Sequence, residues 1–546
     1  MLKVESIHWK SSLPLTEDYV QDYNKVSDLF EYDPWNESSW AERAAWLDRG
    51  NPLAADRGQL AEVLLSYNKA IGNAPEALDA IGKLKQQETL CIVGGQQAGL
   101  FSGQALVIYK AITLIRSARL ASEKLGRPVI PVFWIAGEDH DFDEVNHMYY
   151  LSPEMQVSKI KIEHPSGKRS TVSSLKISQE QWTTALELLD SSLIPTEFKP
   201  GWMDLLRTAA AESHTLVDFF GRIIAKLFGA QGLVLVNSDD PQLRRLESPM
   251  FTKLIREHEA VNAAVLTGRD KLEALGYSSQ VDLNERSANL FVVDDDERIF
   301  MYAAGPDGPY TDRKKERIYS REQLLDWAES APERISNNVM TRPLMQDYLF
   351  PVLGTVLGPG EIAYWAITRE AFHQIGLKMP IVVPRLEFTI LEGTVQKNMH
   401  KFGLTLEDVL YHLEDKQEEW LRSQDTLKLE ERFAEVRARF VEGYQPLVEL
   451  IGGINPGIGK LGETNMGKII EQIHFLEQKA SDGARAQFDA SLRHFQRIGL
   501  SVVPMGKPQE RVYNIFSYLN KYGDSWLYEI VNSDLKPDGK HKILYM

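Results

Sequence analysis

The sequence predicts an α/β protein whose core is a doubly wound, Rossmann-like parallel sheet, joined to a separate α-helical coiled-coil domain. Short apolar runs repeatedly end in Gly, Asp or Pro and lead into helical patterns, the alternation expected of a parallel sheet. Two intervening stretches alternate apolar and polar residues, which indicates inserted β-structure. From about residue 386 onward, apolar residues recur every three or four positions over long segments, as in a coiled coil.

The chain of 546 residues is long enough for roughly two to four domains. We expect the Rossmann-like core over residues 1–385, with β-rich insertions near 145–200 and 265–335 that wall the site. An antiparallel helical pair over 386–504 forms the coiled coil, and 505–546 returns to the core.

Composition narrows the class of protein. Asp and Glu total 77 against 61 Lys and Arg, a net charge of -16, so we expect no nucleic-acid partner. The single cysteine, Cys91, excludes an internal disulfide framework and fits a reducing compartment. The sequence shows neither a signal-peptide core nor an apolar run of membrane-spanning length. We therefore expect a cytoplasmic protein without a membrane partner.

The elements follow in order along the chain. Residues 1–88 are mostly helical, with "SWAERAAWLDRG" and "QLAEVLLSYNKAIG" as two helices and "YDPW" as a turn. Five buried strands are then expected, in "LCIV", "VIPVFWI", "LVLV", "YLFPVLGTVLG" and "MPIVVP". Because the carboxyl ends of parallel strands share one edge of the sheet, the polar residues after these strands should line a common cleft.

The first of these strand ends is the glycine-rich turn "GGQQAGLFSGQ", which leads into a helix that starts at Ala105. Unpaired N–H groups at the start of such a helix can bind an anion. The candidate substrate-binding residues in this turn are Gly95, Gln96, Gln97, Gly99, Gly103 and Gln104.

The second strand end, "GEDHDFDEVNH", holds five carboxylates and two histidines. We take His140, Asp139 and Asp141 as candidate catalytic residues for acid-base work or substrate binding. Two alternatives stay open: Asp139 and Asp141 cap the next helix, or His140, Glu144 and His147 bind a metal. The spacing is not that of a known metal motif, so we expect no metal requirement.

A third dense patch is "RPLMQDYLFPVLGTVLGPGEIAYW", and the next strand ends in an arginine. The planar guanidinium of Arg342 suits a carboxylate, whereas Glu361 is equally explained as a charge in the first turn of a helix. The candidate substrate-binding residues in this region are Arg342, Gln346, Asp347, Gly360, Glu361, Tyr364 and Arg385.

Standard nucleotide motifs are absent from the sequence. In "GGINPGIGKLGE" the phosphate-loop pattern fails, because Ile454 replaces the first glycine and Leu461 replaces the Ser or Thr that follows the lysine. Neither "GGQQAG" nor "GPGEIA" has the dinucleotide-binding pattern. We therefore expect no conventional nicotinamide or flavin site.

The coiled-coil seam begins with Phe433, Val436 and Phe440 and resumes with Met466, Ile469 and Ile473, and "GGINPGIGKLGETN" supplies the turn between the two helices. A seam of this length favours dimerisation, but packing within its own domain is the alternative. After it, "GKPQERVYNIF" offers a second nucleotide candidate at a helix start, although the segment is better explained as a plain helix start. The residues concerned are Gly506, Pro508, Gln509 and Arg511.

Four segments together, "VGGQQAGLFSGQALVIYK", "WIAGEDHDFDEVNH", "RPLMQDYLFPVLGTVLGPGEIAYWA" and "PQERVYNIFSYLNKYG", closely resemble the BshC family of bacillithiol-biosynthesis cysteine ligases. The resemblance spans essentially the whole chain. It implies a core like that of class I aminoacyl-tRNA synthetases and nucleotidyltransferases, with connecting-peptide insertions and a coiled coil that pairs two subunits. It also implies a reaction, the amide ligation of L-cysteine to glucosaminyl malate, the last step of the pathway.

The chain departs from the wider synthetase class. Where that class carries H-x-G-H after its first strand, this sequence has Phe101, Ser102, Gly103 and Gln104, and it lacks K-M-S-K-S. Because an amide bond between a free carboxylate and an amine needs an energy source, we still expect ATP or another nucleotide to activate the cysteine carboxylate. The alternatives are a metal-dependent hydrolase centred on residues 138–147 and a non-enzymatic dimeric scaffold.

Overall fold

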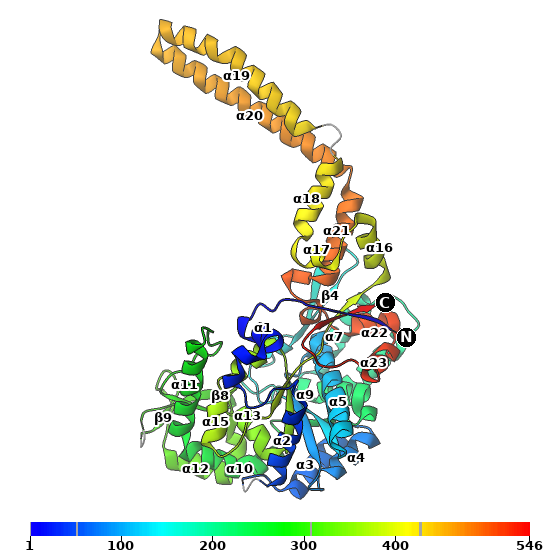
Figure 1. The fold of residues 1–546 in the computed structure, drawn as a ribbon, viewed down its shortest axis with the longest axis vertical. Coiled ribbons are helices and arrows are strands. Elements are labelled where there is room, and N and C mark those ends of the chain that lie inside the picture. The colour runs from blue at the N-terminus through cyan, green and yellow to red at the C-terminus, as the bar shows by residue number, and fades with distance from the viewer. Residues whose placement is uncertain (1, 51–52, 306–307, 425–427) are drawn as a thin grey trace. The chain divides into compact units, whose positions relative to one another are not determined.

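The computed structural model describes residues 2–50, 53–305, 308–424 and 428–546 (Figure 1). Contacts within the chain divide it into two units. The first unit comprises Met1–Ser152, Val157–Ile390 and Gln509–Tyr545, and the second comprises Pro153–Gln156, Leu391–Pro508 and Met546.

The first unit is built on a parallel sheet of five strands in the order β13-β12-β2-β3-β6. These strands are β2 (Leu90–Gln96), β3 (Val129–Ile135), β6 (Val234–Asn237), β12 (Val352–Leu357) and β13 (Ile381–Pro384). All are the expected strands, and the doubly wound Rossmann-like class is confirmed. Chain order runs outward from β2 in both directions, so the topological switch point lies between β2 and β12. Ligands of open α/β sheets bind at the carboxyl ends of the strands on either side of such a point.

Helices cover both faces of this sheet because the side chains of each buried strand alternate between the faces. Cys91 and Val93 of β2 belong to the apolar core that includes Leu60 of α3 (Arg57–Ala70) and Ile81 of α4 (Pro75–Lys83). On the opposite face, Gly94 lies against Leu114 of α5 (Ala105–Leu125). Burial also raises the pKa of the Cys91 thiol well above its ordinary value.

The two insertions differ in content. The first begins with an antiparallel hairpin, β4 (His147–Leu151) and β5 (Val157–Lys161), but continues as helices α7 (Gln179–Ser192), α8 (Lys199–Ala211) and α9 (Leu216–Phe228). The prediction of a β-rich stretch over 145–200 is therefore correct only for its first part, because Trp182, Leu186 and Leu189 recur at helical spacing and are buried.

The second insertion carries an antiparallel sheet in the order β10-β9-β8-β7-β11. Its elements are α10 (Pro241–Arg256), α11 (His258–Ala274), β7 (Ser287–Asp294), β8 (Glu297–Ala303), β9 (Tyr310–Thr311), β10 (Ile318–Tyr319), α12 (Arg321–Ser330) and β11 (Ile335–Asn337). This sheet supplies one wall of the candidate site.

The other elements of the first unit include a small sheet in the order β1-β15-β14. The remaining helices and strands are β1 (Lys3–Ile7), α1 (Pro14–Gln21), α2 (Glu37–Asp48), α6 (Phe142–Val145), α13 (Arg342–Leu349), α14 (Pro359–Trp365), α15 (Arg369–Gln374), β14 (Glu387–Leu391), α22 (Phe516–Tyr522), α23 (Ser525–Val531) and β15 (His541–Tyr545). Single 3-10 turns occur at Tyr23–Lys25, Ser27–Leu29, Leu100–Ser102, Gly229–Gln231, Pro332–Arg334, Pro504–Gly506 and Gln509–Arg511.

The second unit is helical, and α19 and α20 lie side by side as its two longest helices (Figure 1). Its helices are α16 (Gly393–Phe402), α17 (Leu406–Tyr411), α18 (Leu413–Gln424), α19 (Leu429–Ile454), α20 (Pro456–Ala486) and α21 (Asp489–Val502). Across the described ranges, every helix is too short or too polar to pass through a membrane.

The glycine-rich stretch between the long helices is not a loop, contrary to the sequence prediction. The turn consists of Asn455 alone, whose side chain accepts a hydrogen bond from the N–H of Gly457 at 2.8 Å and so caps α20. The glycines allow the helices to pack closely: a Cβ on Gly459 would lie 2.7 Å from the Cα of Gly452. The second predicted helix is also broken, between Ala486 and Asp489.

Candidate active site

A cavity of 410 Å³ lies in the first unit at the carboxyl end of β3, between the parallel sheet and the inserted sheet. The loop after β3 contributes Glu138, Asp139 and His140 to its lining. The inserted sheet contributes a polar and aromatic wall, and α13 contributes Arg342. The lining residues from that wall are Ser287, Asn289, Phe291, Arg298, Phe300, Tyr302 and Asn337.

His140 is held between two arginines. Its Nε2 lies 2.7 Å from the Nη2 of Arg169, and its Nδ1 lies 3.1 Å from the Nη1 of Arg298. A neutral imidazole has one acceptor nitrogen, so only one guanidinium group can donate to it at a time. Burial, together with the charges of Arg298 and Arg169, lowers the pKa of His140 to about 4. The ring is therefore neutral at pH 7.

Asp139 connects the glycine-rich turn to this loop. Its Oδ2 accepts a hydrogen bond from the Nε2 of Gln97 at 2.6 Å, and its Oδ1 accepts one from the backbone N–H of His140 at 2.7 Å. Burial alone would raise the pKa of Asp139, but the Gln97 bond and the Arg298 charge hold it below its ordinary value. Gln97 also donates to Glu144 at 2.5 Å. The glycine-rich turn after β2 and the acidic loop after β3 are therefore joined by hydrogen bonds.

Asp141 caps a helix, unlike Asp139, which bonds to the glycine-rich turn. Its Oδ1 accepts a hydrogen bond from the backbone N–H of Glu144 at 3.2 Å, which caps the four-residue helix α6. This is the helix-capping alternative that the sequence left open for Asp141.

Arg298, which sequence analysis did not single out, orders the floor of the cavity. Its side chain is 6% exposed. It donates to Ser336 Oγ at 2.8 Å and to the carbonyl oxygen of Asn337 at 2.5 Å, and its guanidinium stacks 3.7 Å from the centre of the Phe291 ring. These contacts link β8 to β11 and fix the guanidinium toward His140.

Two further cavity residues are buried polar groups. Asn337 is 2% exposed, and neither atom of its side-chain amide has a hydrogen-bond partner among the described residues. An unpaired buried amide is costly, so a ligand that bonds to it gains affinity. Glu138 accepts a hydrogen bond from the buried Arg244 at 2.7 Å. Sequence offered no signal for Asn337, which stands in a short polar run, "SNN".

The switch point holds a second polar cluster, centred on Lys110. Its ammonium donates to the carbonyl oxygen of Gly95 at 2.6 Å, to Gln96 Oε1 at 3.0 Å and to Glu361 Oε2 at 2.5 Å. Burial lowers the pKa of Lys110 to about 8, although the charge of Glu361 opposes this. Glu361 also accepts from the N–H of Gly358 at 2.7 Å. Lys110 therefore joins the ends of β2 and β12.

Arg342 lies between the two clusters. It lines the cavity and donates to the hydroxyl of Tyr364 at 2.9 Å, while its Nη1 lies 3.5 Å from Gln346 Oε1. The structure thus brings together the predicted residues Gln97, Asp139, His140 and Arg342 on one side, and Gln96, Glu361 and Tyr364 on the other.

Comparison with known proteins assigns both halves of the chain. Residues 2–386 match the model "Bacillithiol biosynthesis BshC, N-terminal Rossmann-like domain", and residues 388–546 match "Bacillithiol biosynthesis BshC, C-terminal coiled-coil domain". The chain belongs to the BshC family. Relatives named "Putative cysteine ligase BshC" include one from Geobacillus sp. (strain WCH70), 37% identical over the full length of both chains. Another, from Symbiobacterium thermophilum, is 37% identical over 97% of each chain. The family likeness expected from the sequence is confirmed, and it makes this chain a ligase.

Several predicted residues of this BshC family member lie away from the cavity. Asp347 forms an ion pair of 2.5 Å with the buried Arg43 and lines a separate pocket that also contains Trp46 and Arg57. Arg385 is engaged by Glu510 at 2.5 Å and by Glu387 at 3.0 Å. In both clusters the arginine and its carboxylates pair with one another, and the structure does not bring Asp347 or Arg385 to the cavity.

The second nucleotide candidate is divided between the units. Gly506 and Pro508 belong to the second unit, whereas Gln509 and Arg511 belong to the first. The side-chain amide of Gln509 accepts from the N–H of Ile390 at 2.8 Å and donates to its carbonyl at 2.9 Å, as a neighbouring strand would. The expected helix start is a 3-10 turn, Gln509–Arg511, whose Gln509 extends the hydrogen bonding of β14.

The glycines of the first turn serve close packing. A Cβ on Gly99 would lie 2.5 Å from the Cα of Gly103, and one on Gly95 would lie 3.0 Å from the carbonyl oxygen of Trp134. Phe101, Ser102 and Gly103 all have positive φ, and the side chain of Asn514 donates to the carbonyls of Phe101 and Gly103. Gly360, by contrast, is exposed near the start of α14.

The start of α5 is not open to an anion in the way the sequence suggested. The backbone N–H of Ala105 donates to the carbonyl oxygen of Tyr513 at 2.9 Å, and Gln104 is half-buried just before the helix. The first donor of this helix is thus already bonded within the protein.

The metal-site alternative also finds no support. Among the described residues, no group of three or more His, Cys, Asp and Glu side chains is arranged to hold a metal ion. Both ring nitrogens of His140 face guanidinium groups, and Nδ1 of His147 lies 3.2 Å from the side-chain oxygen of Asn146.

Proposed function

We propose that the chain joins L-cysteine to glucosaminyl malate through an amide bond, the last step of bacillithiol biosynthesis. Membership of the BshC family supports the reaction class. The observation that carries the proposal is the cavity at the end of β3, whose lining combines Arg298 and Arg342 with Glu138 and Asp139. Both substrates carry an amine and at least one carboxylate, and such a cavity offers a partner for each.

The arginines of the cavity can bind the carboxylates of the substrates, and its acids can bind their ammonium groups. A guanidinium group forms two parallel hydrogen bonds to a carboxylate, and fixing it beforehand reduces the entropy lost on binding. Arg298 is fixed in this way by Ser336, Asn337 and the Phe291 ring. Asp139 is charged at pH 7, because its pKa lies below the ordinary value.

His140 then acts as a base only when substrate is bound. With its pKa at about 4, the free enzyme's imidazole takes up a proton weakly at pH 7. Burial is the main cause of the low pKa, and the charges of Arg298 and Arg169 lower it further. A carboxylate bound to these arginines neutralises their share, so the pKa of His140 rises from its value in the free enzyme. In that state the ring accepts a proton from the attacking amine more readily.

Amide formation in water needs an energy source, and we propose ATP or another nucleotide for this role. The Rossmann-like core supports the proposal at the level of fold. Because the first donor of α5 is bonded to Tyr513, we assign no nucleotide position and route no step through one.

We further propose that the chain works in the cytoplasm as a homodimer paired through α19 and α20. The single cysteine is consistent with a reducing compartment. Several apolar side chains of this helical pair are at least half exposed, which supports a second copy as partner. They are Val436, Leu447, Leu450, Ile454, Leu461, Phe475 and Leu476.

The test is an assay of the purified chain with cysteine, glucosaminyl malate and each nucleotide in turn, with product mass and nucleotide cleavage measured together. We expect an amide product and cysteine-dependent release of pyrophosphate. Arg298→Ala should abolish product, whereas the exposed Lys314→Ala should not. Failure to form the amide with any nucleotide would reject the proposed reaction.

A further inference from the structure

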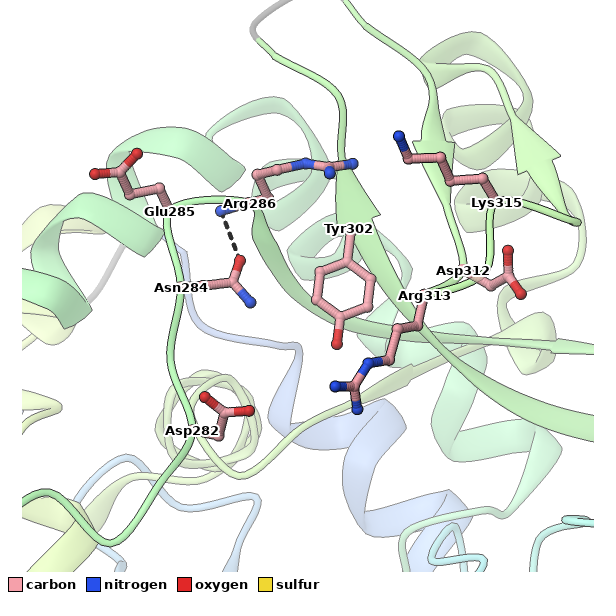
Figure 2. A pocket seen from close by; sticks show the side chains of 8 residues that line it. All are labelled: Asp282, Asn284, Glu285, Arg286, Tyr302, Asp312, Arg313 and Lys315. Carbon is pink, nitrogen blue, oxygen red and sulfur yellow. Dashed lines mark hydrogen bonds between the residues drawn. The ribbon is translucent and has the colours of Figure 1, made fainter.

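A second pocket, of 470 Å³, adjoins the candidate active site (Figure 2). Asp282 and Tyr302 line both the pocket and the cavity, so the two are neighbours along the same wall of the inserted sheet. The other residues of the pocket are Asn284, Glu285, Arg286, Asp312, Arg313 and Lys315.

An aromatic strip runs from the cavity to this pocket. The rings of Phe291 and Phe300 meet edge to face with centres 5.1 Å apart, and those of Phe300 and Tyr302 do so at 5.0 Å. All three are partly exposed and line the cavity. Exposed aromatic faces in a cavity offer a flat apolar surface against which a ring of a ligand can lie.

The pocket end of this strip carries three cationic and three acidic side chains. Among the described residues, Arg286, Arg313 and Lys315 form no ion pair with a carboxylate. In the view of Figure 2 the side chains of Arg286 and Arg313 lie on either side of Tyr302, toward the top and the bottom of the picture, while the Glu285 carboxylate points away from the ring.

The three acids of the pocket are placed differently from one another. Asp312 already accepts hydrogen bonds from the backbone N–H groups of Glu316 and Arg317, at 2.8 and 3.1 Å. Asp282 lies where the two cavities meet. A carboxylate at that boundary is an acceptor for hydroxyl groups, while the unpaired cations attract carboxylates.

We propose that this pocket binds the acidic half of a sugar-derived substrate: a ring that lies against Phe300 and Tyr302, with its carboxylates on Arg286, Arg313 and Lys315. The inference rests on the proposed function, in which this ligand is glucosaminyl malate. The amine of the sugar then faces the cavity that holds Asp139 and His140, and cysteine occupies the end of that cavity nearer the parallel sheet.

The test compares binding of glucosaminyl malate with binding of methyl glucosaminide, which has the same ring and amine but no carboxylate, by calorimetry. For Arg286→Ala/Arg313→Ala we expect the affinity for glucosaminyl malate to fall about 10- to 100-fold, the size expected for lost charge-assisted hydrogen bonds. Affinity for methyl glucosaminide should stay unchanged. Lys314→Ala removes a charge from the same loop outside the pocket and should bind both like the wild type.

Two outcomes overturn the inference: the double variant binds glucosaminyl malate as tightly as the wild type, or it loses affinity for both ligands equally. In the ligation assay, the variant should raise the KM for glucosaminyl malate and leave the KM for cysteine unchanged. The binding measurement does not depend on turnover. If the wild type binds glucosaminyl malate through these arginines but forms no amide, the proposed ligation is refuted and the pocket assignment stands.

Discussion

At the scale of single residues, the neutral imidazole of His140 between two guanidinium groups is the most informative feature of the site. An isolated histidine near several carboxylates suggests a raised pKa or a metal ligand, yet here burial together with the charges of Arg298 and Arg169 lowers the pKa. Neither arginine is near His140 in sequence, so the sequence alone does not predict that the pKa of His140 is lowered.

We predict that His140→Asn lowers turnover by roughly 10², the usual size of a general acid-base contribution, with little change in melting temperature. Asparagine keeps an acceptor for Arg298 or Arg169 but cannot take up the proton of the amine. Turnover and thermal unfolding are measured on the same preparation. A stable variant with wild-type activity would remove His140 from the mechanism, and a loss confined to melting temperature would make it structural.

Buried histidines should also set the acid limit of stability. Burial lowers the pKa of His541 to about 4, from an ordinary value of 6.5. Above pH 6.5 neither folded nor unfolded protein protonates this group, whereas between pH 6.5 and 4 only the unfolded chain does. Stability is therefore lost as pH falls through this window, by about 2 kcal/mol at pH 5 for one such histidine.

The check is urea unfolding at pH 7.5 and pH 5.0 for the wild type and for His541→Gln, which retains a polar partner for Thr389. We expect the variant to lose about 2 kcal/mol less than the wild type between the two pH values. Equal losses in the two proteins would mean that His541 is protonated in the folded state.

At the scale of elements, the strands, their ends and an inserted β-wall near 265–335 were predictable from sequence, whereas the side chains that this wall brings to the cavity were not. Gln97 and Asp139 follow neighbouring parallel strands, and this topology alone brings them together. Arg298 and Asn337 meet through pairing of β7 with β8 and β11, whose register no local pattern specifies. Lys110 was missed because a lysine on an amphipathic helix normally faces solvent, whereas here it turns back to the end of β2.

The β2–α5 turn depends on two glycines. Gly99→Ala should destabilise the first unit by about 1–3 kcal/mol, the usual cost of overpacking, because its Cβ would lie 2.5 Å from the Cα of Gly103. Gly82→Ala is the matched control, since nothing lies within 4 Å of its Cβ in the exposed part of α4. That change should stabilise the protein by up to about 1 kcal/mol. Equal melting temperatures for the two variants would show that the turn relaxes freely.

At the scale of the whole molecule, the sequence predicted two long helices correctly but misjudged their connection. The glycines between the two long helices predict a turn, whereas in the structure they allow the two helices to pack closely. The exposed apolar residues are accordingly concentrated near the hairpin turn, where Leu450 is 68%, Ile454 77% and Leu461 67% exposed.

We predict that Leu450→Glu/Leu461→Glu converts a dimer to monomers in sedimentation velocity, because burying unpaired charge in an interface costs several kcal/mol, roughly. The core should remain folded, with the ultraviolet circular dichroism of the wild type. Lys468→Glu, on an exposed position of α20, is the control for added negative charge and should stay dimeric. A double variant that sediments as the wild-type dimer would place the interface elsewhere.

Arg298 and His140 are 158 residues apart, and their contact closes the cavity. The cavity exists only when the inserted sheet, which lies between β6 and β12 in the chain, has folded and reached the end of β3. Closing so long a loop is slow compared with forming local helices. In refolding, helical structure should therefore return before substrate binding, which needs contacts between residues far apart in the chain.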